Sequence, residues 1–218
     1  MIKAVLFDLD GTLLDTSKDL AAALNAVRQH NNLKPLSHAQ IRPHVSNGAN
    51  ALLQCGFGDL DPPTQEQYRL QLLDYYLQNI ATQTEAFDGI NQLLDELHHA
   101  NIPWGIVTNK PKIYTRALLS QYSFMHAPAA VICPEDVNNT KPSPEGLLKA
   151  CHIINCQPPE AVYVGDHIRD IEAGKNAGMQ TIAVGYGFTD TPSCHLSWGA
   201  DYTVQHAHQI IPIIRSIL

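Results

Sequence analysis

The chain alternates short apolar runs with longer amphipathic segments. Between most of the apolar runs, hydrophobic residues recur with a helical period, as at Ile90, Leu93, Leu94 and Leu97. Six runs have the length and near-continuous apolarity of strands buried on both faces: Lys3–Phe7, Pro103–Val107, Ala129–Cys133, Ala161–Val164, Gln180–Val184 and the weaker Tyr202–Val204. This alternation predicts an α/β fold with an open, doubly wound parallel sheet. Helices are expected over Pro144–Ile154, Ile168–Ala177 and Ala207–Ile217.

One long stretch interrupts the alternation. From about Asp15 to Glu85 the chain shows no strand pattern and only helical periodicity, such as the stripe Leu20, Leu24 and Val27. A stretch of this length is too long for a loop in a compact domain. We therefore predict a core of residues 1–14 and 86–218 and an inserted all-helical domain of residues 15–85. Because the insert begins directly after an acidic motif, we expect it to cover that motif as a cap.

Composition excludes several classes of protein. The hydrophobic and charged fractions of the 218 residues, 44% and 16%, are ordinary for a globular protein. The formal charge of −7 and the lack of any Lys/Arg run argue against a nucleic-acid partner. No apolar run reaches the roughly 18 residues of a membrane span, and the N-terminus has no signal-peptide pattern. Five cysteines without a CxxC pair indicate reduced thiols. We expect a cytoplasmic monomer or homodimer.

Polar residues follow several of the predicted strands. Asp8, Thr108 and Asp166 each come directly after a strand, and Lys141 lies in the loop after another. In open α/β sheets, ligands bind beyond the carboxyl ends of the strands. We therefore expect these four side chains to meet at one edge of the sheet.

The first of these positions carries two carboxylates. Asp8 can attack phosphorus and form an aspartyl-phosphate, and Asp10 can protonate the leaving oxygen and later take a proton from water. Gly11 and Thr12 permit a turn that brings backbone N–H groups towards a bound phosphate. The alternative is a simple acidic turn, since Asp-Gly is a common turn pair.

The segment after the second strand supplies hydrogen-bond donors. Thr108, Asn109 and Lys110 are expected to contact the phosphoryl group, helped by the positive end of the following helix. Lys141 adds a compact positive charge for the nucleophile and the transition state. Alternatively, Thr108 or Asn109 only caps that helix, and Lys141 is a solvated loop residue.

Two further acids stand at the start of a predicted helix. Asp166 and Asp170 have i,i+4 spacing, which would place them on one helix face. Together with Asp8 they would form a carboxylate set suited to Mg²⁺. The alternative is that acids in a first helical turn merely complement the helix dipole.

The insert contains a polar cluster around a flexible glycine. This cluster either reads the substrate or is ordinary surface, and it comprises Arg42, His44, Ser46, Asn47, Gly48 and Asn50. Of these residues, we assign Arg42, Asn47 and Gly48 to substrate binding.

The four motifs together resemble those of the haloacid dehalogenase superfamily of phosphohydrolases. The matching residues are Asp8-x-Asp10-Gly11-Thr12, Thr108, Lys141 and Gly165-Asp166-x-x-x-Asp170. The resemblance spans essentially the whole chain and implies a Rossmann-like core with a helical cap. It implies that Asp8 is the nucleophile and Asp10 the acid/base. Asp8, Asp10 (through its backbone carbonyl) and Asp166 would bind Mg²⁺, and Asp170 would support the metal or Lys141.

The residues around these motifs resemble those of one group of that superfamily. Asp15-Thr16-Ser17-Lys18-Asp19-Leu20 is similar to the phosphoglycolate phosphatase group. Other stretches are similar to its N-acetylmuramate 6-phosphate phosphatase branch, which serves cell-wall sugar recycling: Trp104–Pro111, Ile132–Pro134, Gly165–Glu172 and Trp198–Asp201.

The leading hypothesis is therefore a Mg²⁺-dependent phosphomonoester hydrolase. Its expected substrate is a small anionic phosphate ester, either N-acetylmuramate 6-phosphate or 2-phosphoglycolate. A phosphosugar mutase shares every core residue and is the main alternative. A halide-removing enzyme would use one nucleophilic Asp and no metal, which Asp10, Asp166 and Asp170 argue against. A catalytically inactive binding module should have lost one of the core groups, and none is missing.

Overall fold

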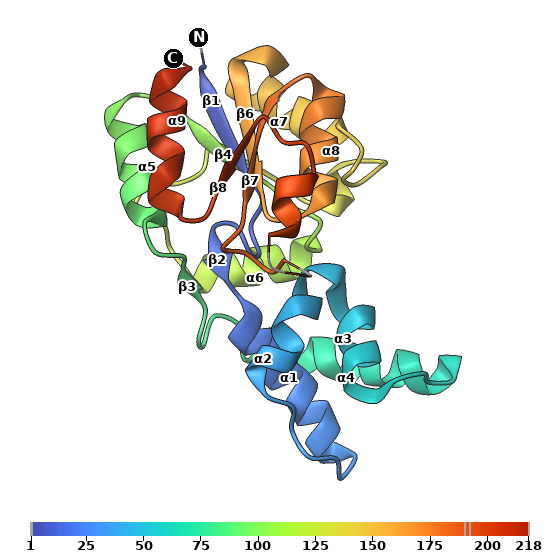
Figure 1. Ribbon diagram of the computed structural model, residues 1–218. Helices are drawn as coiled ribbons and strands as arrows, with labels where there is room; N and C mark the ends of the chain where they lie inside the picture. The colour runs from blue at the N-terminus through green and yellow to red at the C-terminus, as the bar shows by residue number, and fades with distance from the viewer. Residues whose placement is uncertain (1, 190, 192, 218) are drawn as a thin grey trace.

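The larger part of the molecule is built around one parallel sheet (Figure 1). The computed structural model describes residues 2–189, 191 and 193–217, so the predicted outer bounds at 1 and 218 lie outside the described residues. The strand order is β5-β4-β1-β6-β7-β8, and every neighbouring pair is parallel. The strands are β1 (Ala4–Phe7), β4 (Trp104–Val107), β5 (Ala130–Ile132), β6 (Ala161–Gly165), β7 (Gln180–Val184) and β8 (Tyr202–Val204).

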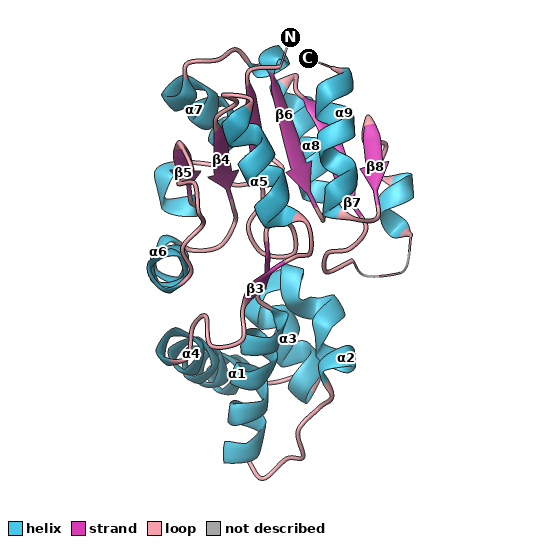
Figure 2. Cartoon of the chain, turned by 90° about the vertical axis from the view of Figure 1, so that its left-hand side faces the viewer, coloured by secondary structure: helices cyan, strands magenta, loops and turns pink. Residues whose placement is uncertain are grey.

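Helices cover both faces of this sheet, as Figure 2 shows. Because strand side chains alternate between faces, Val5 and Phe7 pack with one helical layer while Ala4 and Leu6 pack with the other. The first layer contains α5 (Ile90–His99), α6 (Lys112–Gln121) and α9 (Ile210–Ser216), and the second contains α7 (Glu145–Ile154) and α8 (Ile168–Ala177). Central strands buried on both faces explain the continuous apolar runs in the sequence.

A helical part lies beyond the carboxyl ends of the strands (Figure 1). Its apolar cluster includes Leu24, Leu52, Leu72 and Tyr76, and one side chain of the sheet part, Phe188, packs into it. Its elements are α1 (Ser17–His30), α2 (His38–Ile41), the 3₁₀ helix η1 (Arg42–Asn47), α3 (Gly48–Phe57) and α4 (Pro62–Gln78). We call these elements the helical insert.

The predicted doubly wound parallel sheet is confirmed, and each predicted strand agrees with an observed one to within a residue or so at its ends. The expectation of no strand near the ends of the insert was wrong. Leu14–Asp15 (β2) and Glu85–Ala86 (β3) pair antiparallel where the chain enters and leaves the insert. Two-residue strands are too short for any periodicity to reveal. The last predicted helix is also divided, into the 3₁₀ helix Ala207–Gln209 and α9.

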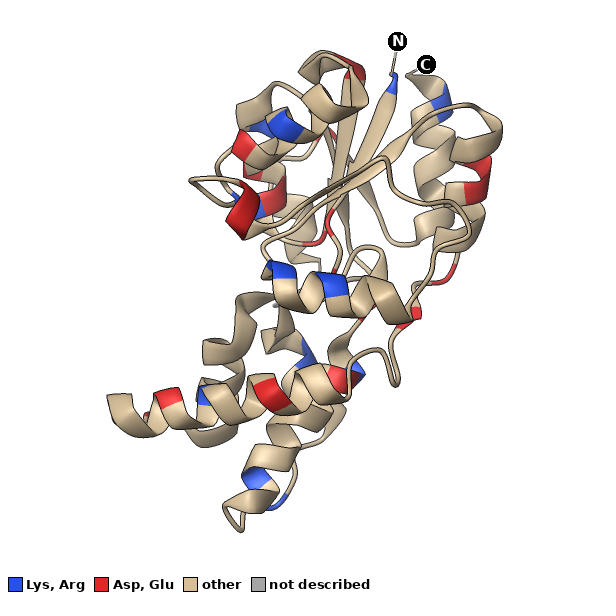
Figure 3. Ribbon diagram, turned by 180° about the vertical axis from the view of Figure 1, so that it is seen from behind, with Lys and Arg blue, Asp and Glu red and all other residues tan. Residues whose placement is uncertain are grey.

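Charged residues of both signs are found on the helical insert as well as around the sheet, as the ribbon in Figure 3 shows. All five cysteines are free thiols. Among the described residues, no helix is both long and apolar enough to cross a membrane.

The two connections to the insert are tied together by one buried carboxylate. Asp19, in the first turn of α1, is only 4% exposed. It accepts hydrogen bonds from the backbone N–H of Gln83 (2.9 Å) and the hydroxyl of Thr84 (2.7 Å), both in the returning connection. Together with the β2–β3 pair, this contact fixes how the insert leaves the core.

Replacing Asp19 with alanine should therefore destabilise the fold. The buried hydroxyl of Thr84 and the backbone N–H of Gln83 would lose their acceptor, so we expect the free energy of unfolding in urea to fall by about 1–3 kcal/mol. The matched control is Lys18→Ala, an exposed neighbour on the same helix, which should change it by less than about 0.5 kcal/mol. Equal stability of the two variants would contradict this role for Asp19.

Candidate active site

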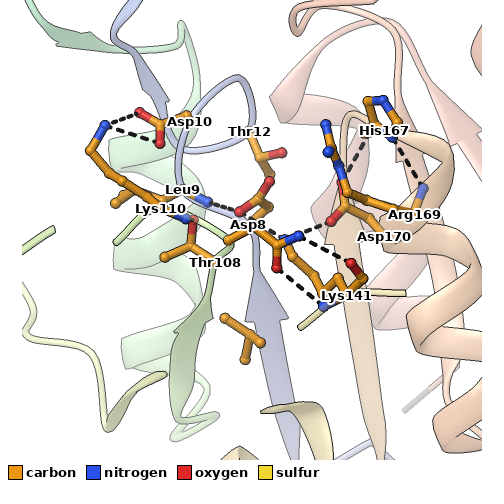
Figure 4. A network of polar contacts seen from close by, with 12 residues as sticks. Asp8, Leu9, Asp10, Thr12, Thr108, Lys110, Lys141, His167, Arg169 and Asp170 are labelled. Atoms are coloured by element: carbon orange, nitrogen blue, oxygen red, sulfur yellow. Dashed lines mark hydrogen bonds and ion pairs between the residues drawn. The ribbon is translucent and has the colours of Figure 1, made fainter. Parts of the chain in front are cut away.

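The carboxyl edge of the sheet gathers the residues predicted from strand ends (Figure 4). Asp8 follows β1, Thr108 follows β4, Asp166 follows β6, and Lys141 comes from the loop after β5. Asp8 and Lys141 form an ion pair of 2.9 Å. The four predicted positions thus lie together at the carboxyl edge of the sheet.

Lys141 is the positive centre of this group. It is buried, and its Nζ lies 2.7 Å from Asp170 Oδ1 and 2.9 Å from the Tyr163 hydroxyl. Burial disfavours its charged form, but the carboxylates of Asp170 and Asp8 outweigh this and raise its pKa. Lys141 is thus a buried, ion-paired side chain and not a solvated loop residue.

Asn109 fixes the backbone of Lys141. Its side-chain amide donates to the Lys141 carbonyl and accepts from the Lys141 N–H, both at 3.1 Å. This reciprocal pair links the loops after β4 and β5. Asn109 therefore positions the lysine, in addition to the contact with substrate that we predicted for it.

The nucleophile candidate is held through one oxygen. Asp8 Oδ1 accepts from the backbone N–H of Leu9 at 2.8 Å and is also the atom that pairs with Lys141. Neither contact involves Oδ2. Asp8 lies at a cavity that is also lined by Thr108, so its second oxygen is left for a ligand.

Three carboxylates crowd together beside Lys141. Asp8, Asp166 and Asp170 each offer an oxygen within 4.8 Å of those of the others. When all three are ionised they carry a charge of −3. The adjacent Lys141 contributes +1, so the net charge of the group is −2. Burial, and then the charges of Asp8 and Asp170, raise the pKa of Asp166 to about 8. A divalent cation would remove this excess charge, so the donor set fits Mg²⁺.

Asp166 is oriented by three donors from other elements. Its oxygens accept from the Thr12 hydroxyl (3.1 Å), the backbone N–H of Phe188 (2.8 Å) and the Ser46 hydroxyl (3.4 Å). Thr12 is fully buried. Its side chain therefore positions Asp166, whereas we had expected the Gly11-Thr12 turn to present backbone groups to the phosphate.

The expected helical pairing of Asp166 with Asp170 is wrong. Helix α8 begins at Ile168, after the cap residue His167, so Asp166 lies in the preceding loop. Asp170 is in the first turn, where it accepts from the His167 N–H at 3.0 Å. The sharp turn after β6 brings the two acids together instead of a shared helix face.

Asp10 faces a different set of partners. Its carboxylate accepts from Thr16 Oγ1 at 2.6 Å and pairs with Lys110 Nζ at 3.0 Å. Lys110 also donates to the Tyr76 hydroxyl of α4 at 2.9 Å. Burial opposes the charge on Lys110, but Asp10 and Tyr76 prevail and raise its pKa. The Asp10 side chain is not part of the three-carboxylate cluster.

A cavity of about 620 Å³ lies between the strand ends and the helical insert. Of the predicted substrate-binding residues, Asn47, Gly48, Asn109 and Lys110 line it. Its apolar walls come from both parts of the chain and include Leu20, Val45, Leu52, Leu73 and Ile113.

Arg42, also predicted to bind substrate, is not among the residues that line this cavity. Its guanidinium donates to the carbonyls of Gly187 (2.7 Å) and Tyr186 (3.0 Å) and lies 5.0 Å from the centre of the Phe188 ring. Arg42 therefore joins the insert to the loop after β7.

The polar cavity residues that the sequence did not reveal include Arg69, Tyr76, Tyr114 and Arg169. Arg169 follows Asp166 by three residues, and its Nη2 donates to the Ser46 carbonyl at 2.6 Å. Its proximity to an acidic motif was the one available signal. Tyr76 lies in α4 and carried no signal in the sequence.

Comparison with known proteins agrees with this geometry. A family model described as haloacid dehalogenase-like hydrolase matches residues 5–184. The chain is 38% identical to the N-acetylmuramic acid 6-phosphate phosphatase of Pseudomonas aeruginosa, covering 98% of this chain and 95% of that protein. It is also 38% identical to a phosphoglycolate phosphatase of Xanthomonas campestris pv. campestris, covering 95% and 94%.

Solved structures share the fold. A hydrolase of the haloacid dehalogenase superfamily from Geobacter sulfurreducens superposes with a TM-score of 0.75 at 25% identity, covering 98% of this chain and 96% of that one. A predicted phosphoglycolate phosphatase from Haemophilus somnus gives a TM-score of 0.85 at 24% identity, covering 98% of each chain.

Replacing Gly11 with alanine should disrupt the carboxylate cluster. Gly11 has φ +83, and an added Cβ would lie 2.1 Å from Asp166 Oδ2. Displacement of that carboxylate should weaken Mg²⁺ binding, measured by calorimetry, by about 10- to 100-fold.

The matched control for Gly11→Ala is Gly58→Ala. Gly58 also has a positive φ, +71, but an added Cβ there meets nothing within 4 Å. Both variants carry the same kind of backbone strain. Equal Mg²⁺ affinity in the two variants would show that Gly11 does not act through Asp166.

Proposed function

The chain belongs to the haloacid dehalogenase-like hydrolase family, and on this premise we propose that it is a Mg²⁺-dependent phosphatase that transfers the phosphoryl group of its substrate to Asp8. The main support is the position of Asp8, with Oδ1 held by Lys141 and Leu9 at the edge of a cavity under the insert. Its curated relatives are named as phosphatases.

In the first half-reaction, Asp8 attacks phosphorus. A bond forms between the carboxylate oxygen and phosphorus while the bond from phosphorus to the ester oxygen breaks. Lys141 stabilises the developing negative charge. The leaving oxygen takes a proton from Asp10, whose carboxyl group is placed by Thr16 and Lys110.

In the second half-reaction, water attacks the phosphorus of the Asp8 phosphate. Asp10, now a carboxylate, accepts a proton from that water, and the bond between Asp8 and phosphorus breaks to release phosphate. The Lys110 ammonium, 3.0 Å from Asp10, stabilises the carboxylate form that this step requires. The products are the free alcohol, inorganic phosphate and the original enzyme.

The side chains that would hold Mg²⁺ are those of Asp8 and Asp166, with the backbone carbonyl of Asp10 as a further ligand. Asp170 accepts from Lys141 and the His167 N–H, so it orients the lysine beside the metal. When bound, Mg²⁺ would supply positive charge that screens the nucleophile from the phosphate.

For the substrate, we propose N-acetylmuramate 6-phosphate ahead of 2-phosphoglycolate. A cavity of about 620 Å³ with several apolar side chains in its wall suits a sugar with apolar substituents. A two-carbon ester would leave most of that space to water. The N-acetylmuramic acid 6-phosphate phosphatase of Pseudomonas aeruginosa, 38% identical, supports this choice. The reaction would then belong to cell-wall sugar recycling in the cytoplasm.

Replacing Asp8 with asparagine should abolish turnover. We expect phosphate release from N-acetylmuramate 6-phosphate with Mg²⁺ to fall by at least about 10³-fold, because the nucleophile is lost. The control is Asp59→Asn, an exposed carboxylate of the insert. Retained activity in Asp8→Asn would rule out this mechanism. A wild-type preference for 2-phosphoglycolate would overturn only the substrate, and phosphoryl transfer to a sugar faster than to water would indicate a mutase.

Replacing Asp10 with asparagine should affect poor leaving groups most. A sugar alkoxide needs a proton as it leaves, whereas nitrophenolate does not. We expect kcat/KM for N-acetylmuramate 6-phosphate to fall by about 10²- to 10⁴-fold, and that for p-nitrophenyl phosphate to fall much less. Asp15→Asn, which alters a neighbouring carboxylate bonded to Ser17, is the control. Equal losses on both substrates would argue against Asp10 as the acid.

A further inference from the structure

Arg169 lies where the helical insert meets the active site. It is the second residue of α8, three positions after Asp166, and it lines the same cavity as Asp8. Its Nη2 donates to the backbone carbonyl of Ser46 in η1 at 2.6 Å. The guanidinium is therefore held at the boundary between the sheet part and the insert.

The other cations of the cavity are already neutralised. Arg69 and Lys110 also line it. Arg69 makes two bonds of 2.7 Å to Glu66, and Lys110 pairs with Asp10. Arg169 forms no ion pair with a carboxylate of the described residues.

An arginine in this state can take an anion. Its planar guanidinium has five N–H donors and binds carboxylates through two parallel hydrogen bonds. The bond to Ser46 uses a donor of Nη2, and Arg169 is half-buried. Within the described part of the chain, it is the cavity-lining cation without an ion pair to a carboxylate. Its charge acts on the neighbouring Asp170, but the Asp170 carboxylate is bonded to Lys141.

The anion it meets differs from the transferred phosphate. The phosphoryl group must reach Asp8, where Thr108 and Lys141 gather at the strand ends. Arg169 instead contacts the insert, through Ser46. The part of a substrate that extends from the strand ends towards the insert would therefore lie near Arg169.

We propose that Arg169 binds a carboxylate carried by the substrate, so that the enzyme selects phosphate esters with a second anionic group over neutral sugar phosphates. This inference rests on the phosphatase function proposed above and adds a specificity residue to it. The Arg169 guanidinium is also bonded to the insert. The same side chain would therefore bind the carboxylate and hold the insert against the sheet part.

The test compares two sugar phosphates that differ in the carboxylate. N-acetylglucosamine 6-phosphate lacks the lactyl group of N-acetylmuramate 6-phosphate and is otherwise the same sugar. Arg169→Gln should lower kcat/KM for the carboxylate substrate by about 10- to 100-fold and leave the neutral one within about threefold. Arg169→Lys should recover part of the lost preference, since a lysine keeps the charge without the two-pronged geometry.

The matched control is Arg69→Gln. Arg69 lines the same cavity but is committed to Glu66, so its loss should leave the ratio of the two kcat/KM values unchanged. An equal fall on both substrates in Arg169→Gln would overturn the proposal, because it would mean that Arg169 acts on the phosphate or only seats the insert.

Binding to Asp8→Asn protein separates this proposal from the catalytic one. Calorimetry in that background should show tighter binding of N-acetylmuramate 6-phosphate than of N-acetylglucosamine 6-phosphate, and the added Arg169→Gln change should remove the difference. Lack of any such difference overturns the carboxylate subsite even if both sugars are hydrolysed. Failure of the wild type to hydrolyse any phosphate ester, p-nitrophenyl phosphate included, would instead overturn the phosphatase.

Discussion

The arrangement of the site depends on a local excess of negative charge. Three carboxylates lie within 4.8 Å of one another at the ends of buried strands, and one ammonium group, that of Lys141, offsets them. Burying unmatched charge is costly, so the surroundings are built to support it. Asp166 accepts three hydrogen bonds, and Asn109 holds the Lys141 backbone through its side-chain amide. The same excess negative charge fits the divalent cation proposed for this site.

The insert is connected to this charge cluster through the loop after β7. The backbone N–H of Phe188 donates to Asp166 while its ring packs into the apolar core of the insert. Arg42 binds the carbonyls of the two preceding residues. On the opposite wall, Tyr76 of α4 meets the Lys110 that holds Asp10. The position of the insert is thus coupled to Asp166 and Asp10, two of the carboxylates on which the proposed chemistry depends.

The positions at the strand ends could be predicted from the sequence, because each follows directly from a local strand pattern. Asp8, Thr108 and Asp166 each follow a strand, and the geometry of a parallel sheet brings such positions to one edge. The contacts of the insert were not readable. Arg42 sits in a polar segment that suggested substrate binding, yet the packing of the insert brings it to backbone carbonyls. Tyr76 looked like an ordinary core residue because its hydroxyl finds Lys110 only once the insert is folded over the sheet.

These contacts give the sheet part and the insert different roles. The sheet part supplies the carboxylates of the proposed reaction and the ammonium group of Lys141, all placed by loops at strand ends. The insert supplies most of the cavity wall and the Ser46 carbonyl that holds Arg169. Changes in the insert should therefore alter which ester is accepted, whereas changes at the strand ends should alter whether any ester is cleaved.

The central claim is that Asp8 becomes phosphorylated during turnover. The most direct measurement is to quench the enzyme while it hydrolyses N-acetylmuramate 6-phosphate, reduce the protein with borohydride and map the modified residue by mass spectrometry. An acyl phosphate at Asp8 would be reduced to homoserine, and we predict this product at position 8 alone. Turnover that proceeds without modification at Asp8, or with modification at another acid, would contradict it.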